Sequence, residues 1–358
     1  MKLTGLTILL ALSFPTLSAE PLPTKFAKRD RNKDGKLSRE EVPESFAKFK
    51  FAQADRNKDG FLDSTELERV AKKLTPKGES NPSKPVNPVT PKAEDIQIIR
   101  NIIYRKDPKD TKDWNKLDLY LPKAKGFATL TWIHGGGLHS GDKSRIAEVA
   151  KRFVAEGYGV ASINYRLYPD AKYPTQIQDV AQAFAWTHEN IAGKGGDPNL
   201  IFVAGGSAGG HLTALLATNG SFLKEHGLKS SAICGAIPIS GLMDVSRVGT
   251  ERRKGIWGND PKTYRTASPL HHARKDAPPM LLLHAQHDTA NRRKQNQEMY
   301  DALKKANHPN ITIHELKDRT HNDIRSHLAG RNDPGALLIL TFLQKHSAHK
   351  ASLPNSKK

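Results

Sequence analysis

A serine stands in a sequence setting that suits a nucleophile. Gly205-Gly206-Ser207-Ala208-Gly209 follows the apolar run 200–204 and precedes an Ala- and Leu-rich stretch that predicts a helix. In a G-x-S-x-G turn between a strand and a helix, small flanking residues let the chain turn sharply, so that the serine Oγ is exposed above the sheet. The N-terminal end of the helix also directs its dipole and free N–H groups at a developing oxyanion. We predict that Ser207 is a nucleophile for acyl transfer.

A glycine-rich segment upstream supplies the donors that such a serine needs. His134-Gly135-Gly136-Gly137 follows the apolar run 128–133. A loop of this type presents backbone N–H groups to the oxyanion, and its glycines let the backbone approach the substrate carbonyl closely. The N–H groups of Gly136, Gly137 and Ala208 are the candidate donors of the oxyanion hole.

An acid and a base are expected after the serine, in that order. Asp288 lies just beyond the apolar run 280–283, and His321 lies in the loop after the predicted strand 311–316. We predict that His321 takes the serine proton, and that Asp288 fixes the tautomer of His321 and stabilises its imidazolium form.

Other residues compete for these two roles. The chain has 15 histidines, and His314 and His327 lie close to His321 in the sequence. Asp244 follows the apolar run 233–239 and is an alternative acid. Order and placement favour Asp288 and His321.

Two further motifs have the spacing of calcium ligands. A twelve-residue loop can bind Ca²⁺ through positions 1, 3, 5, 7, 9 and 12, with glycine at the sharp turn of position 6. The first loop offers Asp30, Asn32, Asp34, the backbone of Lys36, Ser38 and Glu41. The second offers Asp55, Asn57, Asp59, the backbone of Phe61, Asp63 and Glu66. Gly35 and Gly60 occupy position 6, and Leu37 and Leu62 at position 8 are expected to join the loops through a short β contact.

Both loops match the calcium-loop pattern fully, and residues 22–70 resemble the EF-hand family. The connection between the loops, residues 42–54, is short and contains Pro43. The second loop has more carboxylates than the first, so we expect it to bind Ca²⁺ more tightly. Because extracellular calcium is plentiful, a permanent structural ion is favoured over a calcium sensor.

Composition divides the chain into five segments. Residues 1–19 combine Lys2, a short apolar run and a small residue at Ala19, which predicts a signal peptide cleaved near Ala19 and export to the periplasm or the medium. The other segments are an EF-hand pair at 20–74, a Pro-, Lys- and Ser-rich linker at 75–94, a large domain at 95–347 and a disordered basic tail at 348–358.

The large domain alternates buried strands with helical patterns. Segments 95–104 and 116–121 alternate like half-buried antiparallel strands. Continuous apolar runs follow at 128–133, 160–163, 200–204, 233–239 and 280–283, with helical patterns at 146–156, 175–191, 208–218, 292–306 and 334–344. This order predicts a doubly wound α/β fold with a mostly parallel sheet, beside the small all-α EF-hand module.

The charge and the cysteine content limit the function classes. The formal net charge is +19, but no nucleic-acid-binding motif accompanies it, so we expect no nucleic-acid partner and consider an anionic polysaccharide surface instead. No segment is long and apolar enough to predict a membrane span. The one cysteine, Cys234, lies in an apolar run and is expected in the core.

The combined motifs resemble α/β-hydrolases of the hormone-sensitive-lipase-like and acetylxylan/feruloyl esterase group over about residues 96–345. The motifs are Leu117 to Pro122, His134 to Gly137, Asn164-Tyr165-Arg166-Leu167 with Tyr173-Pro174, Gly205 to Gly210, and Ala267-Ser268-Pro269-Leu270. The resemblance implies carboxylester hydrolysis through an acyl-enzyme, with Ser207, Asp288 and His321 at the triad positions. Two residues depart from the pattern: Gly206 replaces the Asp usual in the lipase-like branch, and His139 replaces a common aromatic residue.

We therefore expect a secreted serine carboxylesterase that hydrolyses short acyl esters, such as acetyl or feruloyl esters of polysaccharide, with no cofactor in its chemistry. Two alternatives remain. Kynurenine formamidases share the S-A-G-G-H element of 207–211, so a formamidase or peptidase with the same triad is one. A calcium-dependent binding protein on an inactive hydrolase scaffold is the other.

Overall fold

The computed structural model describes residues 29–32, 34–42, 51–55, 57–64, 66–67, 96–106, 112 and 114–352. The predicted signal peptide, 1–19, and the predicted linker, 75–94, lie outside these residues. Contacts divide the chain into two compact units, Met1–Asn87 and Pro88–Lys358.

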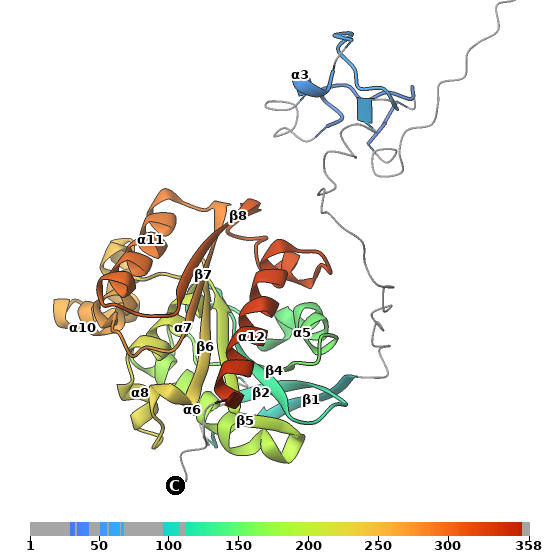
Figure 1. Ribbon diagram of the computed structural model, residues 1–358. Helices are drawn as coiled ribbons and strands as arrows, with labels where there is room; N and C mark the ends of the chain where they lie inside the picture. Colours follow the sequence, from blue (N-terminus) through green and yellow to red (C-terminus); the bar gives the residue numbers. More distant parts are fainter. Residues whose placement is uncertain are drawn as a thin grey trace, which may run out of the picture. The chain divides into compact units, whose positions relative to one another are not determined.

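The larger unit is built on an eight-stranded sheet with the order β1-β2-β4-β3-β5-β6-β7-β8 (Figure 1). β1 pairs antiparallel with β2 and β2 with β4, whereas the pairs from β4 through β3 to β8 are parallel. The strands are β1 Ile96–Ile103, β2 Lys116–Pro122, β3 Phe127–Ile133, β4 Gly159–Ile163, β5 Gly196–Gly206, β6 Ile233–Ile239, β7 Met280–His287 and β8 Ile311–Thr320.

Helices cover both faces of this sheet. One apolar core lies on the side of α6, α7 and α11, and a second lies on the side of α5 and α12. The helices are α5 Ala147–Val154, α6 Thr175–Asn190, α7 Ala208–Thr218, α8 Ser221–Lys224, α9 Thr250–Trp257, α10 Pro261–Ala267, α11 Ala290–Lys305 and α12 Pro334–Ser352. Because both faces are covered, β3, β4 and β6 are buried at every position, which is why they read as continuous apolar runs. The predicted doubly wound, mostly parallel α/β fold is confirmed.

Two features of the helices differ from the sequence prediction. The sequence analysis assigned no helices to 250–267, where α9 and α10 form, because this charged segment has no apolar stripe of helical period. The last helix was expected to end at Gln344, with disorder from 348, but α12 continues to Ser352. Its last turns are held in place from outside the helix, since the Cys234 thiol of β6 donates to the His346 carbonyl at 3.5 Å and the Lys350 ammonium donates to the carbonyl of Ser231.

The smaller unit is organised around the two acidic loops. The backbones of Leu37 and Leu62 exchange two hydrogen bonds of 2.9 Å as an antiparallel bridge. Both side chains are fully buried with Phe51, from the short helix α3 Phe51–Ala54, and with Leu67. Gly35 and Gly60 have φ of 78° and 86°, the left-handed conformation that the turn at position 6 requires. The predicted β contact between the loops is therefore confirmed.

Among the helices that the structure describes, none combines the length and apolar character of a membrane-crossing segment.

Candidate functional site

Ser207 lies at the tight turn between β5 and α7. Its backbone has φ 59° and ψ −115°, a conformation that non-glycine residues rarely adopt. The Ser207 N–H donates to the carbonyl of Ile239 on the neighbouring strand at 2.8 Å, which fixes the turn. A Cβ on Gly209 would lie 2.0 Å from the carbonyl oxygen of Ile133, so only glycine fits there. The motif spacing thus follows from close contact between the turn and β3.

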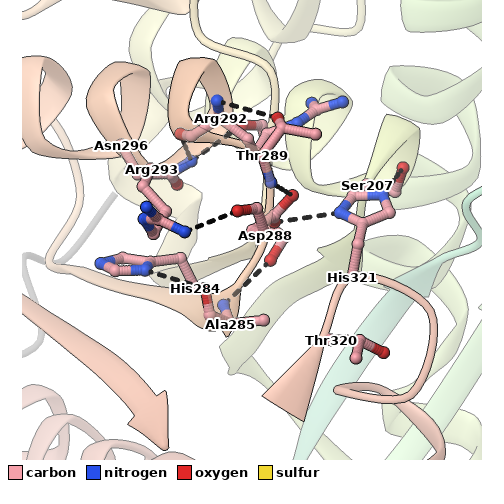
Figure 2. A network of polar contacts seen from close by, with 12 residues as sticks. Ser207, His284, Ala285, Asp288, Thr289, Arg292, Arg293, Asn296, Thr320 and His321 are labelled. Atoms are coloured by element: carbon pink, nitrogen blue, oxygen red, sulfur yellow. Dashed lines mark hydrogen bonds and ion pairs between the residues drawn. The ribbon is translucent and has the colours of Figure 1, made fainter.

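Three side chains form a continuous hydrogen-bonded chain at this turn (Figure 2). His321 Nε2 lies 2.9 Å from Ser207 Oγ, and His321 Nδ1 lies 3.0 Å from Asp288 Oδ2. The Asp288 side chain is 1% exposed and that of His321 is 28% exposed, so the acid is shielded while the imidazole stays accessible. The three residues come from the carboxyl ends of β5, β7 and β8, the edge where parallel sheets of this kind bind ligands.

The turn between β7 and α11 holds Asp288 in place. The Thr289 N–H donates to Asp288 Oδ1 at 2.9 Å, and the Arg293 guanidinium donates to the Asp288 carbonyl at 2.6 Å (Figure 2). Burial favours the neutral carboxyl, but the hydrogen bond and charge of His321 outweigh it and hold the pKa of Asp288 below its ordinary value. Asp288 is therefore an anion at neutral pH.

The competing residues make other contacts. Asp244 accepts hydrogen bonds from Ser246 at the start of a short 3-10 helix and forms an ion pair with Arg247 at 3.1 Å. His327 Nδ1 lies 2.9 Å from the carbonyl of Asp323, and His314 lies within β8. Among the described residues, none of these three forms a hydrogen bond or an ion pair with Ser207.

The predicted oxyanion donors lie in two segments. Gly136 and Gly137 lie in the loop after β3, and Ala208 begins α7 directly after the serine. Among the described residues, the N–H groups of these three have no hydrogen-bond acceptor. A Cβ on Gly135 would lie 3.3 Å from the Cβ of Ser207, which shows how closely the loop passes the nucleophile. The assignment of these three groups as oxyanion donors stays a prediction.

A buried histidine anchors this loop. The ring of His134 stacks on Tyr165 with centroids 4.3 Å apart, and the Tyr165 hydroxyl donates to the His134 carbonyl at 2.9 Å. Burial lowers the pKa of His134 to about 4, so its imidazole is neutral at physiological pH. His134 thus shapes the glycine loop rather than transferring protons.

A small pocket of about 20 Å³ opens beside Ser207. Its apolar wall consists of Leu138, Leu242, Val248 and Trp257. His211 completes the wall: its Nδ1 lies 2.9 Å from the carbonyl of Leu242, and burial lowers its pKa to about 4. A pocket of this size holds little more than one water-sized group, which suits a small acyl substituent.

Two arginines that the sequence did not predict lie at this pocket, and a third lies next to it. Arg252 from α9 and Arg292 from α11 line it together with Ser207. Arg325, from the segment after His321, lies against the glycines next to the serine: a Cβ on Gly206 would be 2.1 Å from Arg325 Cδ. No local pattern marked these residues, because packing of separate elements brings them together.

The EF-hand loops are folded around their acidic side chains. Asp30 Oδ2 accepts from the Gly35 N–H at 3.0 Å, and Asp55 Oδ2 accepts from the Gly60 N–H at 3.1 Å. Glu41 at position 12 accepts from the N–H of Ser38 at 3.0 Å, and this bond, despite partial burial, lowers its pKa. The other predicted ligands lie along the same two loops: Asn32, Asp34, Lys36, Ser38, Asn57, Asp59, Phe61, Asp63 and Glu66.

The donor set fits a hard cation, and one unpartnered oxygen in the second loop marks a candidate position for it. Asp55 Oδ1 is buried and has no hydrogen-bond partner in the described unit, although a buried carboxylate oxygen needs one. In the described residues, no three His, Cys, Asp or Glu side chains converge on one point. EF-hand loops do not require this, since amide and backbone oxygens complete the ligand set.

The sheet, the helices on both faces and the serine at the turn after β5 define an α/β-hydrolase fold. A family model described as BD-FAE matches residues 117–303, and an EF-hand model matches residues 25–42 and 50–71. The chain belongs to the BD-FAE family.

Curated relatives of this chain are named esterases. The chain is 30% identical over 223 residues to Esterase LipQ of Mycobacterium tuberculosis, covering 58% of this chain and 52% of LipQ. It is 29% identical over 267 residues to Esterase LipC of the same organism, covering 69% of this chain and 64% of LipC. The chain thus spans between half and two thirds of the length of these relatives.

Solved structures share the fold at lower identity. A truncated carbohydrate esterase from gut microbiota aligns with a TM-score of 0.61 at 21% identity, over 70% of this chain and 96% of that one. Esterase B from Lactobacillus Rhamnosis aligns with a TM-score of 0.60 at 20% identity, over 72% of this chain and 87% of that one.

Proposed function

We propose that this chain is a serine carboxylesterase that cleaves short acyl esters through Ser207, His321 and Asp288. The observation that carries the proposal is the hydrogen-bonded chain from Ser207 Oγ through His321 to buried Asp288, at 2.9 and 3.0 Å. The candidate oxyanion donors, the N–H groups of Gly136, Gly137 and Ala208, have no acceptor among the described residues and belong to the adjoining loop and helix. A nucleophile, a base, an orienting acid and an oxyanion site together are what acyl transfer requires.

The reaction proceeds in two halves. His321 Nε2 takes the Ser207 proton while Oγ bonds to the ester carbonyl carbon, and the oxyanion accepts hydrogen bonds from the three N–H groups. The imidazolium, stabilised by Asp288, then protonates the leaving alcohol as its C–O bond breaks. Water, deprotonated by His321, attacks the acyl-enzyme and releases the carboxylic acid, and Ser207 regains its proton.

The test is hydrolysis of p-nitrophenyl acetate by the wild type and by Ser207→Ala. We expect the substitution to lower kcat on the order of 10⁶-fold, as loss of a triad nucleophile does. Ser144→Ala, which removes an exposed hydroxyl from the same unit, serves as the matched control and should retain activity. A folded wild type that leaves the ester intact but hydrolyses small amides would contradict esterase activity and favour an amidase.

The acyl group is short and the enzyme is exported. The pocket of about 20 Å³ beside Ser207 suits an acetyl group better than a feruloyl group. Residues 1–19 have the composition of a secretory signal. Acetyl esters of polysaccharide are therefore the favoured substrates. Release of acetate rather than ferulate from esterified polysaccharide would support this assignment.

The EF-hand loops bind calcium as a structural ion. Asp30, Asn32, Asp34, Ser38, Glu41 and the Lys36 carbonyl would hold one ion, and Asp55, Asn57, Asp59, Asp63, Glu66 and the Phe61 carbonyl the other. Among the described residues of this unit, Leu37, Phe51, Leu62 and Leu67 form a small buried core that joins the two loops. Bound calcium would add folding free energy to this core.

A further inference from the structure

Three guanidinium groups surround the candidate nucleophile. Arg252 and Arg292 line the pocket that contains Ser207. Arg325 approaches from the other flank: a Cβ on Gly135 would lie 2.8 Å from Arg325 Nη1 and 3.3 Å from Ser207 Cβ. Gly206 leaves the space that the Arg325 side chain fills, at the position where the lipase-like branch has an aspartate. Gly206, the residue before the serine, thus leaves room for the cationic Arg325 side chain at a position where the lipase-like branch has a carboxylate.

None of these three guanidinium groups forms an ion pair with a carboxylate of the described residues, although the Asp288 charge acts on Arg292. Arg252 donates only to the Gly137 carbonyl at 2.8 Å, and Arg325 Nε is buried with no protein acceptor. The nearby Asp288 carboxylate is already bonded to His321 and Thr289.

The contrast with other arginines of the same unit is clear. Arg166 forms a bidentate pair with Asp179, at 2.8 and 2.6 Å, and Arg247 pairs with Asp244 and Glu298. Half-buried cations are normally paired in this way, because removing an unpaired charge from water is costly. Burial and the charge of Arg252 lower the pKa of Arg292 by more than the nearby Asp288 carboxylate raises it, so a further anion there would be stabilising.

The size of the pocket decides which part of the substrate carries the anion. About 20 Å³ beside Ser207 holds a group the size of the acetyl methyl and leaves no room for an additional carboxylate. Arg252 and Arg292 line this pocket, the first exposed and the second half-buried, so both are accessible to the alcohol part of a bound ester. Guanidinium groups bind carboxylates in a planar, bidentate manner.

We propose that the substrate is a short acyl ester of an acidic alcohol, such as an acidic sugar, and that Arg252 and Arg292 bind its carboxylate. The proposal rests on ester hydrolysis at Ser207 and defines the alcohol part of that substrate.

The experiment compares two acetylated sugars that differ in one charge. The probes are the acetyl esters of methyl galactoside and of methyl galacturonoside, whose C6 carries a hydroxyl or a carboxylate. The wild type should prefer the acidic ester about tenfold or more in kcat/KM at low salt, and the preference should shrink as salt screens the charges. Arg252→Gln and Arg292→Gln should each lower kcat/KM for the acidic ester about 10- to 100-fold, mainly through KM.

Controls separate substrate binding from other roles. The neutral ester should change less than about threefold in both variants, because it makes no charge-assisted bond. Lys254→Gln removes an exposed positive charge from the same helix as Arg252 and should leave both substrates unaffected. Arg292→Lys keeps the charge and should restore part of the preference. Equal losses on both sugars would assign the arginines to oxyanion stabilisation or folding and overturn the proposal.

The two proposals fail separately. If p-nitrophenyl acetate is hydrolysed through Ser207 but the wild type shows no preference for the acidic sugar, the acidic-alcohol inference alone is wrong. If the folded wild type hydrolyses neither the sugars nor p-nitrophenyl acetate, esterase activity itself is wrong.

Discussion

At the residue scale, the assignment of the acid can be tested against its strongest competitor. Asp288 bonds to His321, whereas Asp244 pairs with Arg247. Asp288→Asn would keep the shape of the side chain but remove the charge that stabilises the imidazolium, so we expect kcat to fall by about 10³- to 10⁴-fold. Asp244→Asn weakens a helix cap, an ion pair and a 3.4 Å hydrogen bond from Ser268, at about 1 kcal/mol of folding free energy, and should change kcat less than about tenfold.

The measurement is hydrolysis of p-nitrophenyl acetate under saturating conditions, with circular dichroism to verify folding. A larger loss in Asp244→Asn than in Asp288→Asn would reverse the assignment. Comparing the two is informative because both aspartates follow strands of the same sheet, and only their partners differ.

At the element scale, the fit between the serine turn and β3 predicts a sharp cost for one added methyl group. In Gly209→Ala the new Cβ would meet the Ile133 carbonyl oxygen at 2.0 Å, and the Ile133 backbone cannot move away because it is paired within the central strand β3. We expect a loss of about 2–3 kcal/mol in the free energy of unfolding, with activity reduced further because Ser207 is displaced. Urea denaturation and p-nitrophenyl acetate hydrolysis measure the two effects.

Gly193→Ala is the matched control, since nothing lies within 4 Å of its added Cβ. Its backbone suits alanine, so the unfolding free energy should stay equal or rise by about 0.4–1 kcal/mol. If both variants were equally stable, the close contact at Gly209 would have no energetic consequence.

The strands and helices also explain which site residues could be predicted from the sequence. Ser207 and Asp288 follow apolar runs and His321 follows the predicted strand 311–316, and parallel strands bring such positions to one edge. The helix 208–218 was predicted with the bounds that α7 has, because apolar residues fill it. Arg252, Arg292 and Arg325 carry no such signal: α9 is too polar to be recognised, and only tertiary packing places it over Ser207. Likewise, α12 extends past its predicted end because the contacts of His346 with Cys234 and of Lys350 with Ser231 hold its last turns.

At the scale of the whole molecule, we expect calcium to act on the smaller compact unit, Met1–Asn87, which contains both candidate calcium loops. Asp55 is 9% exposed with one oxygen unpartnered, so a cation at the second loop would satisfy a buried group. Calorimetric titration should show Ca²⁺ binding that Asp55→Ala weakens more than Asp30→Ala, because the second loop has four carboxylates, Asp55, Asp59, Asp63 and Glu66, against Asp30, Asp34 and Glu41. Equal losses in the two variants would remove the ranking of the loops.

Calcium removal should leave the hydrolase unit intact. The residues that form and anchor the candidate active site, from His134 to Arg325, make their recorded contacts within Pro88–Lys358. All four tryptophans, Trp114, Trp132, Trp186 and Trp257, lie in that unit, so their fluorescence reports its unfolding alone. With chelator, the unfolding midpoint measured by fluorescence should stay unchanged, and kcat/KM for p-nitrophenyl acetate should change by less than about twofold. The calorimetric unfolding transition of the EF-hand unit should disappear. A fall in activity on chelation that Asp55→Ala reproduces would instead show that the metal-bound loops act on the active site, and the ion would be regulatory rather than structural.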